Sequence, residues 1–396
     1  MPHEKFFAQS PEAVGIDSRK LEGLFDRAER ELKAGILPSA QIAVAREGKI
    51  AAMRSFGRAT FETREAPVDN DTLYAIFSST KAITSAAAWL LIQEGKLDTD
   101  ERVSDIIPEF GTNGKEAVCV EQLFTHTAGF PHAPFLPSRF LDRAKRLEYF
   151  AKWRLNWEPG SRFEYHPSSS MYVIAEIIGR RSGMSYGDFV RQRISLPLGL
   201  DDLWCGLPRE LHGRLADIVH VGEEMTEADY QAMGFPQPPE TEVTEEAVQG
   251  FNRADFREAG IPGGGGTMTA GDLALFYQAL LTGESIDGER IWAPETLQMA
   301  RQVRSGELRD PVFGHLANRG LGLMISGDSQ RNFRGFGHTN SAEAFGHGGA
   351  GGQIAWADPK TGISLGYCTN GHDRNNLRQA RRSIGISSRA ADCLLD

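Results

Sequence analysis

One apolar stretch, AQIAVAREGKIAAMRSFG at residues 40–57, constrains the fold more than any other segment. The polar turn Arg46-Glu47-Gly48-Lys49 divides it into two apolar runs. Two such runs joined by a short turn predict a β-hairpin, which begins an antiparallel sheet rather than a βαβ unit. Strand-like runs return after residue 319, as GLGLMI, GGQIAWAD and GISLGYCTN.

Helical patterns lie beside and between these runs. Apolar residues recur with helical spacing over 17–34, and an Ala-rich helix is predicted over 79–94, ending at Gly95. A closing helix is expected at 374–395, and residues 96–250 are mostly helical in character with long loops.

These patterns together predict an α+β fold. We expect an antiparallel β-sheet flanked by helices from residues 1–76 and 255–396, and a mostly helical second domain from residues 77–254. A chain of 396 residues has room for one large domain or two intimately joined ones. The functional cleft is expected between these two parts.

Charge and composition exclude several classes of partner. The formal net charge is −10, whereas a phosphate-binding surface needs clustered Lys and Arg, so we expect neither nucleic acid nor a membrane as partner. No run of about 18 apolar residues predicts a membrane span. The four cysteines form no CxxC pair, and MPHEKFFAQSPEAVG has no apolar core of signal-peptide length. We therefore expect a cytoplasmic protein. The sequence does not indicate its oligomeric state.

Residues 223–246 are unusual in charge. They hold eight acidic side chains and neither Lys nor Arg. Such a run predicts a solvated surface excursion. A flap that shapes a substrate cleft is the alternative.

Ser78 and Lys81 form the only S-x-x-K pattern in the chain, where the Ala-rich helix begins. A spacing of three residues puts both side chains on one helical face, where an amine can take the proton of a serine hydroxyl. Free N–H groups at a helix start can also hold an oxyanion. Taken alone, however, the tetrapeptide favours a serine N-cap followed by a surface lysine.

Seven segments in the chain decide this point, at residues 35–48, 78–81, 123–129, 158–165, 197–200, 264–272 and 347–349. In this order they resemble the serine β-lactamase and penicillin-binding-protein superfamily, and most closely the class C β-lactamase-like carboxylesterases called family VIII. They span roughly four-fifths of the chain. Each motif is modest by itself, whereas their common order is specific.

The resemblance implies a three-part catalytic site. Ser78 matches the nucleophile, Lys81 its partner base, and Tyr165 the tyrosine that passes a proton to the leaving group. His347-Gly348-Gly349 matches the third element, which contacts substrate, and the backbone N–H groups of Ser78 and Ala350 would form the oxyanion hole. Whether Lys81 or Tyr165 takes the serine proton stays open.

The chain departs from the family pattern at two places. The family usually shows Tyr-x-Asn, whereas this chain reads Tyr165-His166-Pro167-Ser168-Ser169, so Ser168 or Ser169 would have to take over part of the asparagine role. His347 stands where β-lactamases carry the lysine of Lys-Thr-Gly, and imidazole is largely neutral at pH 7. Both departures favour small esters over β-lactams.

Two other motifs imitate catalytic signatures. Gly183-Met184-Ser185-Tyr186-Gly187 spells the G-x-S-x-G elbow, but a helix precedes it, so we interpret Gly183 as a helix C-cap and Ser185 as the next N-cap. Lys360-Thr361-Gly362 follows the turn residues Asp358-Pro359 and predicts a hairpin tip.

The remaining candidates receive structural interpretations. His220-Val221-Gly222 also matches H-x-G but leads into the acidic segment and not into a strand. His126 is expected to be a hydrogen-bonded structural histidine, and Gly263–Gly266 to bring backbone close to neighbouring elements. No spacing suggests a metal site or a cofactor.

The leading hypothesis is a carboxylesterase that forms an acyl-enzyme on Ser78, with a small-molecule ester or amide as its partner. A β-lactamase, a D-amino-acid peptidase or amidase, or an acyltransferase on the same site are alternatives. A catalytically inactive penicillin-binding-like protein is the alternative of another class, and the missing asparagine is its only support.

Overall fold

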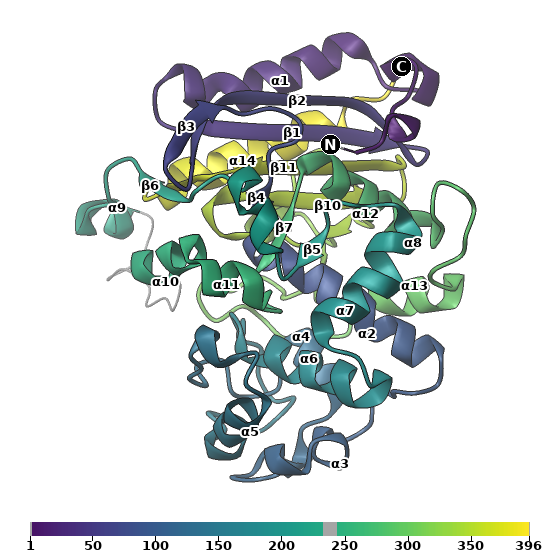
Figure 1. Ribbon diagram of the computed structural model, residues 1–396, viewed down its shortest axis with the longest axis vertical. Coiled ribbons are helices and arrows are strands. Elements are labelled where there is room, and N and C mark those ends of the chain that lie inside the picture. The colour runs from purple at the N-terminus through teal and green to yellow at the C-terminus, as the bar shows by residue number, and fades with distance from the viewer. Residues whose placement is uncertain (1, 233–243, 396) are drawn as a thin grey trace.

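The computed structural model describes residues 2–232 and 244–395. Its largest element is a seven-stranded sheet in which every neighbouring pair is antiparallel. The chain supplies these strands from its N-terminal and C-terminal parts (Figure 1). In spatial order they are β3 (Arg64–Pro67), β2 (Lys49–Phe61), β1 (Ser39–Arg46), β11 (Ile363–Thr369), β10 (Ile354–Asp358), β9 (Phe345–Gly346) and β8 (Met324–Ile325).

Helices cover both faces of this sheet and make up most of the lower half of the molecule in Figure 1. In chain order they are α1 (Ser18–Lys33), α2 (Thr80–Gln93), α3 (Val103–Ile106), α4 (Val120–Thr125), α5 (Arg143–Lys152), α6 (Ser169–Ser182), α7 (Tyr186–Val190), α8 (Leu196–Leu198), α9 (Glu227–Ala232), α10 (Glu245–Gln249), α11 (Ala254–Ala259), α12 (Ala270–Thr282), α13 (Pro294–Arg301) and α14 (Asn376–Ala391). Within the described ranges, no helix combines the length and apolarity needed to cross a bilayer.

The predicted hairpin forms the second and third strands of the sheet, β2 and β1, with its turn at residues 46–49. Alternate residues of β1 serve two different cores, because successive side chains of a strand point to opposite faces. Ile42 and Val44 pack with residues of α1 and α14, whereas Ala43 and Ala45 belong to the core that contains α12 and α2. The strand is therefore buried on both faces.

Two small sheets join the large sheet to the helical part. In the first, β4 (Tyr74–Ala75) and β5 (Trp204–Cys205) pair with β7 (Gly266–Met268) on its two sides. In the second, β12 (Gly371–Asp373) pairs in parallel with β6 (Val219–Val221). Segments far apart in the sequence thus meet just before Ser78.

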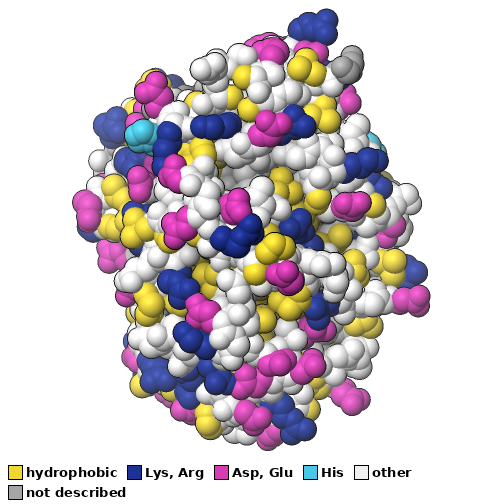
Figure 2. Space-filling view, turned by 90° about the vertical axis from the view of Figure 1, so that its right-hand side faces the viewer, with side chains coloured by type: hydrophobic (Ala, Val, Ile, Leu, Met, Phe, Trp, Pro, Cys, Tyr) yellow, Lys and Arg dark blue, Asp and Glu magenta, His cyan; other side chains and the backbone are white. Residues whose placement is uncertain are grey.

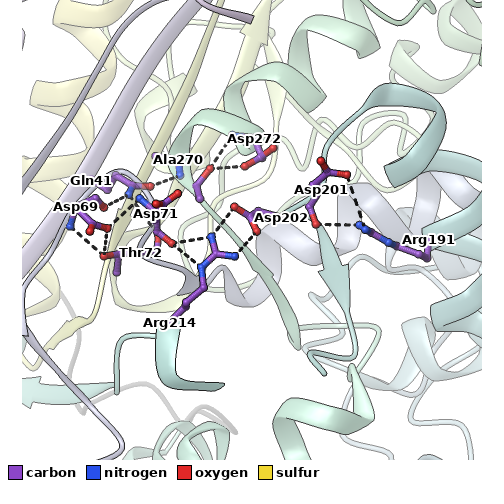
Figure 3. Close-up of polar contacts among 11 residues, drawn as sticks. Gln41, Asp69, Asp71, Thr72, Arg191, Asp201, Asp202, Arg214, Ala270 and Asp272 are labelled. Atoms are coloured by element: carbon purple, nitrogen blue, oxygen red, sulfur yellow. Dashed lines mark hydrogen bonds and ion pairs between the residues drawn. The ribbon is translucent and has the colours of Figure 1, made fainter. Parts of the chain in front are cut away.

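A polar network fixes the loop that leads into β4 (Figure 3). Gln41 on β1 donates to two carbonyl groups of this loop, at 2.9 and 3.3 Å, and accepts a hydrogen bond from the N–H of Ala270 at the start of α12. Arg214 binds the carboxylate of Asp202 and the carbonyl of Asp71. The approach to Ser78 is therefore tied to the large sheet.

The predicted α+β class, with a helix-flanked antiparallel sheet and a helical second part, is confirmed. The division of the chain at residues 77 and 254, and a cleft between the two parts, stay predictions. Residues 233–243 of the acidic segment lie outside the described residues, and α9 and α10 flank them. The flap alternative for this segment therefore also stays a prediction.

The surface charges are mixed on the face that Figure 2 presents. Basic and acidic side chains are interspersed there, with apolar side chains between them. Elsewhere in the described chain, many charged side chains near the surface form ion pairs, such as Arg193 with Glu94 and Lys96 with Glu94. Such pairs contribute little to stability individually because water screens them.

Candidate functional site

Ser78 stands between a short strand and the buried helix α2. The Ile76 N–H donates to the Gly266 carbonyl and extends the pairing of β4 with β7 to the residue before the turn. Phe77 then adopts a φ of 44°, a left-handed conformation that costs a residue with a side chain roughly 1–2 kcal/mol. Ser78 itself is half-buried in a 3₁₀ turn, Phe77–Ser79, and α2 follows immediately. The strained turn directs the Ser78 side chain away from the strand.

Two side chains donate hydrogen bonds to the Ser78 hydroxyl. The Lys81 ammonium and the Tyr165 phenol each lie 3.0 Å from Ser78 Oγ. Lys81 Nζ also donates to the Gly263 carbonyl at 2.7 Å. The structure therefore brings together the three side chains that the sequence predicts to be catalytic, and Gly263 is a fourth partner that the sequence did not indicate.

Lys81 is buried from solvent in the first turn of α2. Burial lowers the pKa of Lys81 below its ordinary value, since a charged ammonium loses its hydration there. Tyr165 opposes this shift through its charge and hydrogen-bonding capacity, whereas the charge of Arg319 adds to it. A lowered pKa brings the neutral amine, which can accept a proton, closer to physiological pH.

Histidines surround Tyr165. The His126 ring lies 4.7 Å from the Tyr165 ring and the His347 ring 6.0 Å from it. Burial, followed by the charge of Arg319, holds the pKa of His126 well below its ordinary value. His126 Nδ1 accepts the N–H of His166, which confirms its structural assignment.

His347, Gly348 and Gly349 pass directly beside the Ser78 turn. Ser79 Oγ donates to the His347 carbonyl at 2.8 Å, and a Cβ at position 349 would collide with the Ile76 carbonyl. The His347 N–H donates to the Ala355 carbonyl and so continues the pairing of β9 with β10. The predicted third element thus lies at the nucleophile.

The His347 side chain is neutral. It is 3% exposed, and burial, followed by the charge of Lys81, holds the pKa of His347 well below its ordinary value. Its Nδ1 lies 2.8 Å from the Gly348 carbonyl and so carries the proton of the neutral tautomer. This position therefore supplies no cation for a carboxylate.

The Ser78 and Ala350 N–H groups are available as donors. No acceptor pairs with either of them among the residues that the structure describes. Ala350 opens a second 3₁₀ turn, Ala350–Gly352, and packs on the small apolar cluster that contains Phe77. Unpaired N–H groups on two adjoining turns have the chemistry that an oxyanion hole requires.

The proposed substitute for asparagine is wrong in the case of Ser169. Its hydroxyl donates to the Phe130 carbonyl at 2.9 Å, inside the start of α6. Ser168 is the N-cap residue of α6 and makes no hydrogen bond to Lys81, whose partners are Ser78 and the Gly263 carbonyl. A backbone carbonyl therefore holds Lys81 here.

The G-x-S-x-G segment is structural, as predicted. Gly183 ends α6 with a φ of 76°, and Ser185 is the N-cap of α7. The segment borders a cavity of about 670 Å³ between α6, α7, β5 and α11. Unlike the Ser78 site, this cavity has no histidine or lysine among its described lining residues. The Ser185 hydroxyl bonds to Asp188 at the start of α7, and no amine or phenol of the described residues bonds to it.

The two other motif copies also lie outside the site. Lys360-Thr361-Gly362 forms the tip between β10 and β11, as predicted. His220-Val221-Gly222 leads into the acidic segment, as predicted, although Val219–Val221 itself forms β6 against β12. Gly263–Gly266 does bring backbone close to its neighbours, since a Cβ at Gly266 would meet Thr80 Oγ1 at 2.7 Å.

Sequence reasoning missed Arg319 as a member of the site. Its Cζ atom lies 5.4 Å from the centre of the Tyr165 ring, and only 8% of the residue is exposed. The available signal was a single arginine directly before the apolar run GLGLMI. Nothing in that pattern places Arg319 beside Tyr165, because a contact between residues far apart in the sequence leaves no characteristic residue spacing.

Comparisons with known proteins agree with this geometry. A model of the Beta-lactamase family matches residues 25–386. A penicillin-binding protein homolog from Caulobacter crescentus is 31% identical with a TM-score of 0.77, covering 96% of this chain and 99% of that chain. A family VIII carboxylesterase is 27% identical with a TM-score of 0.76, covering 95% and 99%. A Salmonella agona protein named "Putative D-alanyl-D-alanine carboxypeptidase" is 26% identical over 389 residues, covering 90% of this chain and 84% of the relative.

Proposed function

Because this chain belongs to the beta-lactamase family, we propose that it is a serine hydrolase that cleaves carboxylic esters through an acyl-enzyme on Ser78. One observation carries the proposal: Ser78 Oγ lies 3.0 Å from both the Lys81 amine and the Tyr165 phenol. A serine hydroxyl becomes a strong nucleophile only when a neighbour takes its proton. Ser78 has two such neighbours within hydrogen-bonding distance.

Acylation follows from this arrangement. When Lys81 or Tyr165 has lost its proton, the Ser78 hydroxyl donates to it and Oγ attacks the ester carbonyl carbon. The carbonyl oxygen gains negative charge, which the N–H groups of Ser78 and Ala350 stabilise. Tyr165, which also bonds to Ser78 Oγ, then passes a proton to the leaving alcohol. The ester C–O bond breaks, and the acyl group stays on Ser78.

Deacylation reuses the same groups. Water takes the place of the alcohol, gives a proton to the base, and attacks the acyl carbonyl carbon. The proton returns to Ser78 Oγ as the acyl–oxygen bond breaks, and the acid leaves. No group beyond Ser78, Lys81, Tyr165 and the two N–H donors is needed for either half of the cycle.

The neutral His347 favours an ester over a substrate with a carboxylate. A β-lactam or a D-alanyl peptide brings a negative charge to the third element, where an imidazole without charge gives it no ion pair. The absence of the Tyr-x-Asn asparagine acts in the same direction, since a backbone carbonyl holds Lys81 instead. The name of the Salmonella agona relative makes a D-amino-acid peptidase the second candidate.

Turnover of three substrates separates these functions. We expect kcat/KM for p-nitrophenyl butyrate to exceed that for nitrocefin and for D-alanyl-p-nitroanilide by at least about tenfold, which equals about 1.4 kcal/mol of transition-state binding. The same assays on Ser78→Ala assign any activity to this site. Faster turnover of nitrocefin, or of the D-alanyl amide, would replace the esterase by a β-lactamase or a peptidase.

A further inference from the structure

We propose that Arg319 is a positioning residue of this site, whose guanidinium stabilises the negative charge that Tyr165 carries when its phenol has given up a proton. The inference rests on the proposed function, because it gives Tyr165 a charged state during acyl transfer. It adds a residue from outside the three sequence motifs that carry the site.

The Arg319 backbone is held firmly in place. Its N–H donates to Ser305 Oγ at 3.0 Å, and its carbonyl accepts from the N–H groups of Arg304 and Ser305. An isolated bridge pairs it with Met324 at the start of β8. The side chain therefore leaves a fixed point and has little freedom to avoid the site.

The guanidinium lies over aromatic rings and not against a carboxylate. Its Cζ atom is 5.4 Å from the ring centre of Tyr165 and 5.4 Å from that of Phe163. Its Nε and Nη1 atoms are buried, and within residues 2–232 and 244–395 neither has a hydrogen-bond partner. A buried guanidinium in this state keeps a strong, uncompensated positive field on its neighbours.

Other buried arginines of the chain show the ordinary arrangement. Arg382 lies 3.3 Å from the Asp373 carboxylate, and Arg257 lies 2.7 Å from that of Asp217. Arg319 is as buried as these, yet no ion pair of Arg319 is found in the described part of the chain. Leaving a buried charge unpaired costs stability, so folding alone does not account for an arginine at this position.

Charged groups around Arg319 leave it positive. Burial lowers the pKa of Arg319 to about 10, which still keeps the guanidinium charged at neutral pH. The charges of Tyr165 and Asp310 favour this charged state, and the charge of Arg334 opposes it. Arg334 is itself paired with Asp328 at 2.7 Å.

Charged groups around Tyr165 show why a second cation matters. Lys81 Nζ lies 5.1 Å from the ring centre, whereas His126 and His347 are neutral. When Lys81 is the group that takes the serine proton, its charge before that step is absent. Arg319 cannot be deprotonated under these conditions and supplies a constant positive charge.

The expected size of the effect follows from distance. A cation within about 4–6 Å moves the titration of an acid by roughly 1–3 pH units. Removing the Arg319 charge is therefore expected to raise the pH at which the tyrosinate of Tyr165 forms by about one unit or more.

Two variants of similar length test the inference. Arg319→Met removes the charge and keeps the packing volume, and Arg319→Lys keeps the charge. Ultraviolet difference titration of each against the same protein with Tyr165→Phe isolates the tyrosinate signal of this one phenol. The kcat/KM–pH profile with p-nitrophenyl butyrate is the second readout, and thermal unfolding checks the fold. Arg319→Gln takes the place of the methionine variant if that variant does not fold.

We expect the Met variant to form tyrosinate at a pH at least about one unit higher than the parent does. The acidic limb of its kcat/KM profile should move in the same direction. At pH 7 its kcat/KM should be at least about tenfold lower. The Lys variant should keep the acidic limb of its kcat/KM profile within a few tenths of a pH unit of the parent's. An unchanged titration in the Met variant would overturn the inference, as would equal loss of rate in both variants with unmoved limbs. Failure of the proposed function is a different result, because the parent would then not turn over the ester whereas the titration needs no substrate.

Discussion

Ser78 and Ser185 each stand immediately before a helix, in a segment that spells a catalytic signature, but their hydroxyl groups have opposite surroundings. Ser185 Oγ donates to the Asp188 carboxylate at 2.6 Å and accepts the Asp188 N–H at 3.2 Å. Both of its hydrogen-bonding functions serve the start of α7. Ser78 makes no capping hydrogen bond, and its oxygen instead accepts from Lys81 and Tyr165.

Neither a motif nor a cavity is therefore sufficient to identify a nucleophile. Ser185 has both, since it is exposed and borders the cavity of about 670 Å³. Its hydroxyl donates to the Asp188 carboxylate, in the first turn of the same helix, and in the described chain neither an amine nor a phenol bonds to it. Ser78 has two titratable partners, the Lys81 amine and the Tyr165 phenol, which is the condition that acyl transfer sets.

Exchanging each serine for alanine gives the largest expected contrast. Ser78→Ala removes the attacking oxygen, so we expect kcat/KM for p-nitrophenyl butyrate to fall roughly 10⁴- to 10⁶-fold while the thermal midpoint stays nearly unchanged. Ser185→Ala removes an N-cap, so it should cost about 1 kcal/mol in the free energy of unfolding and leave the rate unchanged. Steady-state kinetics and denaturant titration measure both. Loss of activity in Ser185→Ala at full folding would reverse the comparison.

A smaller effect is expected where the third element passes beside Ser78. A Cβ at Gly349 collides with the Ile76 carbonyl, so Gly349→Ala must displace the turn that holds the Ala350 N–H. We expect kcat to fall about 10²-fold, the order of effect of losing one oxyanion donor. Gly213→Ala is the matched control, because a Cβ there meets nothing within 4 Å. A kcat for Gly349→Ala equal to that of the control would show that this contact does not matter.

A further contrast concerns pH and the histidines around the Ser78 site. Burial lowers the pKa of His166 to about 3, since a charged imidazolium loses its hydration there. Its Nε2 accepts the Phe130 N–H, which only an unprotonated Nε2 can do. In the unfolded chain, His166 binds a proton below its ordinary pKa of about 6.5, whereas in the folded chain it does not. The free energy of unfolding therefore falls as pH drops from about 6.5 toward 3.

His166→Gln should lessen that fall by up to about 1.4 kcal/mol per pH unit. The exposed His338→Gln is the control and should leave the slope as it is in the parent. Urea titrations between pH 4 and 7 measure the slope for all three proteins. A parent slope that His166→Gln does not change would mean that His166 is charged in the folded protein.

Local chemistry made much of the fold predictable. The turn at 46–49, the buried Ala-rich helix after Ser78, and the αL cap at Gly183 each depend on neighbours in sequence, and each is found in the structure. The order of weak motifs also placed Tyr165 and His347 in one site, although 87 residues separate Tyr165 from Ser78. Local rules predict elements, and motif order predicts which of them meet.

Contacts between distant residues were beyond the sequence. The carbonyl that holds Lys81 belongs to Gly263, 182 residues away, and a backbone oxygen leaves no trace in a residue pattern. Ser169 resembled a substitute for asparagine only because it is close in sequence, whereas the start of α6 directs its hydroxyl to the Phe130 carbonyl. Arg319 was missed for the same reason, since packing alone brings it to Tyr165.

The central claim is that Ser78, and not Ser185, is an activated nucleophile. Incubation with a fluorophosphonate followed by peptide mass spectrometry tests it directly, with Ser78→Ala and Ser185→Ala treated in parallel. The account predicts one adduct, on Ser78, that persists in Ser185→Ala and disappears in Ser78→Ala. An unlabelled Ser78 in the folded parent, or an adduct on Ser185, would contradict it.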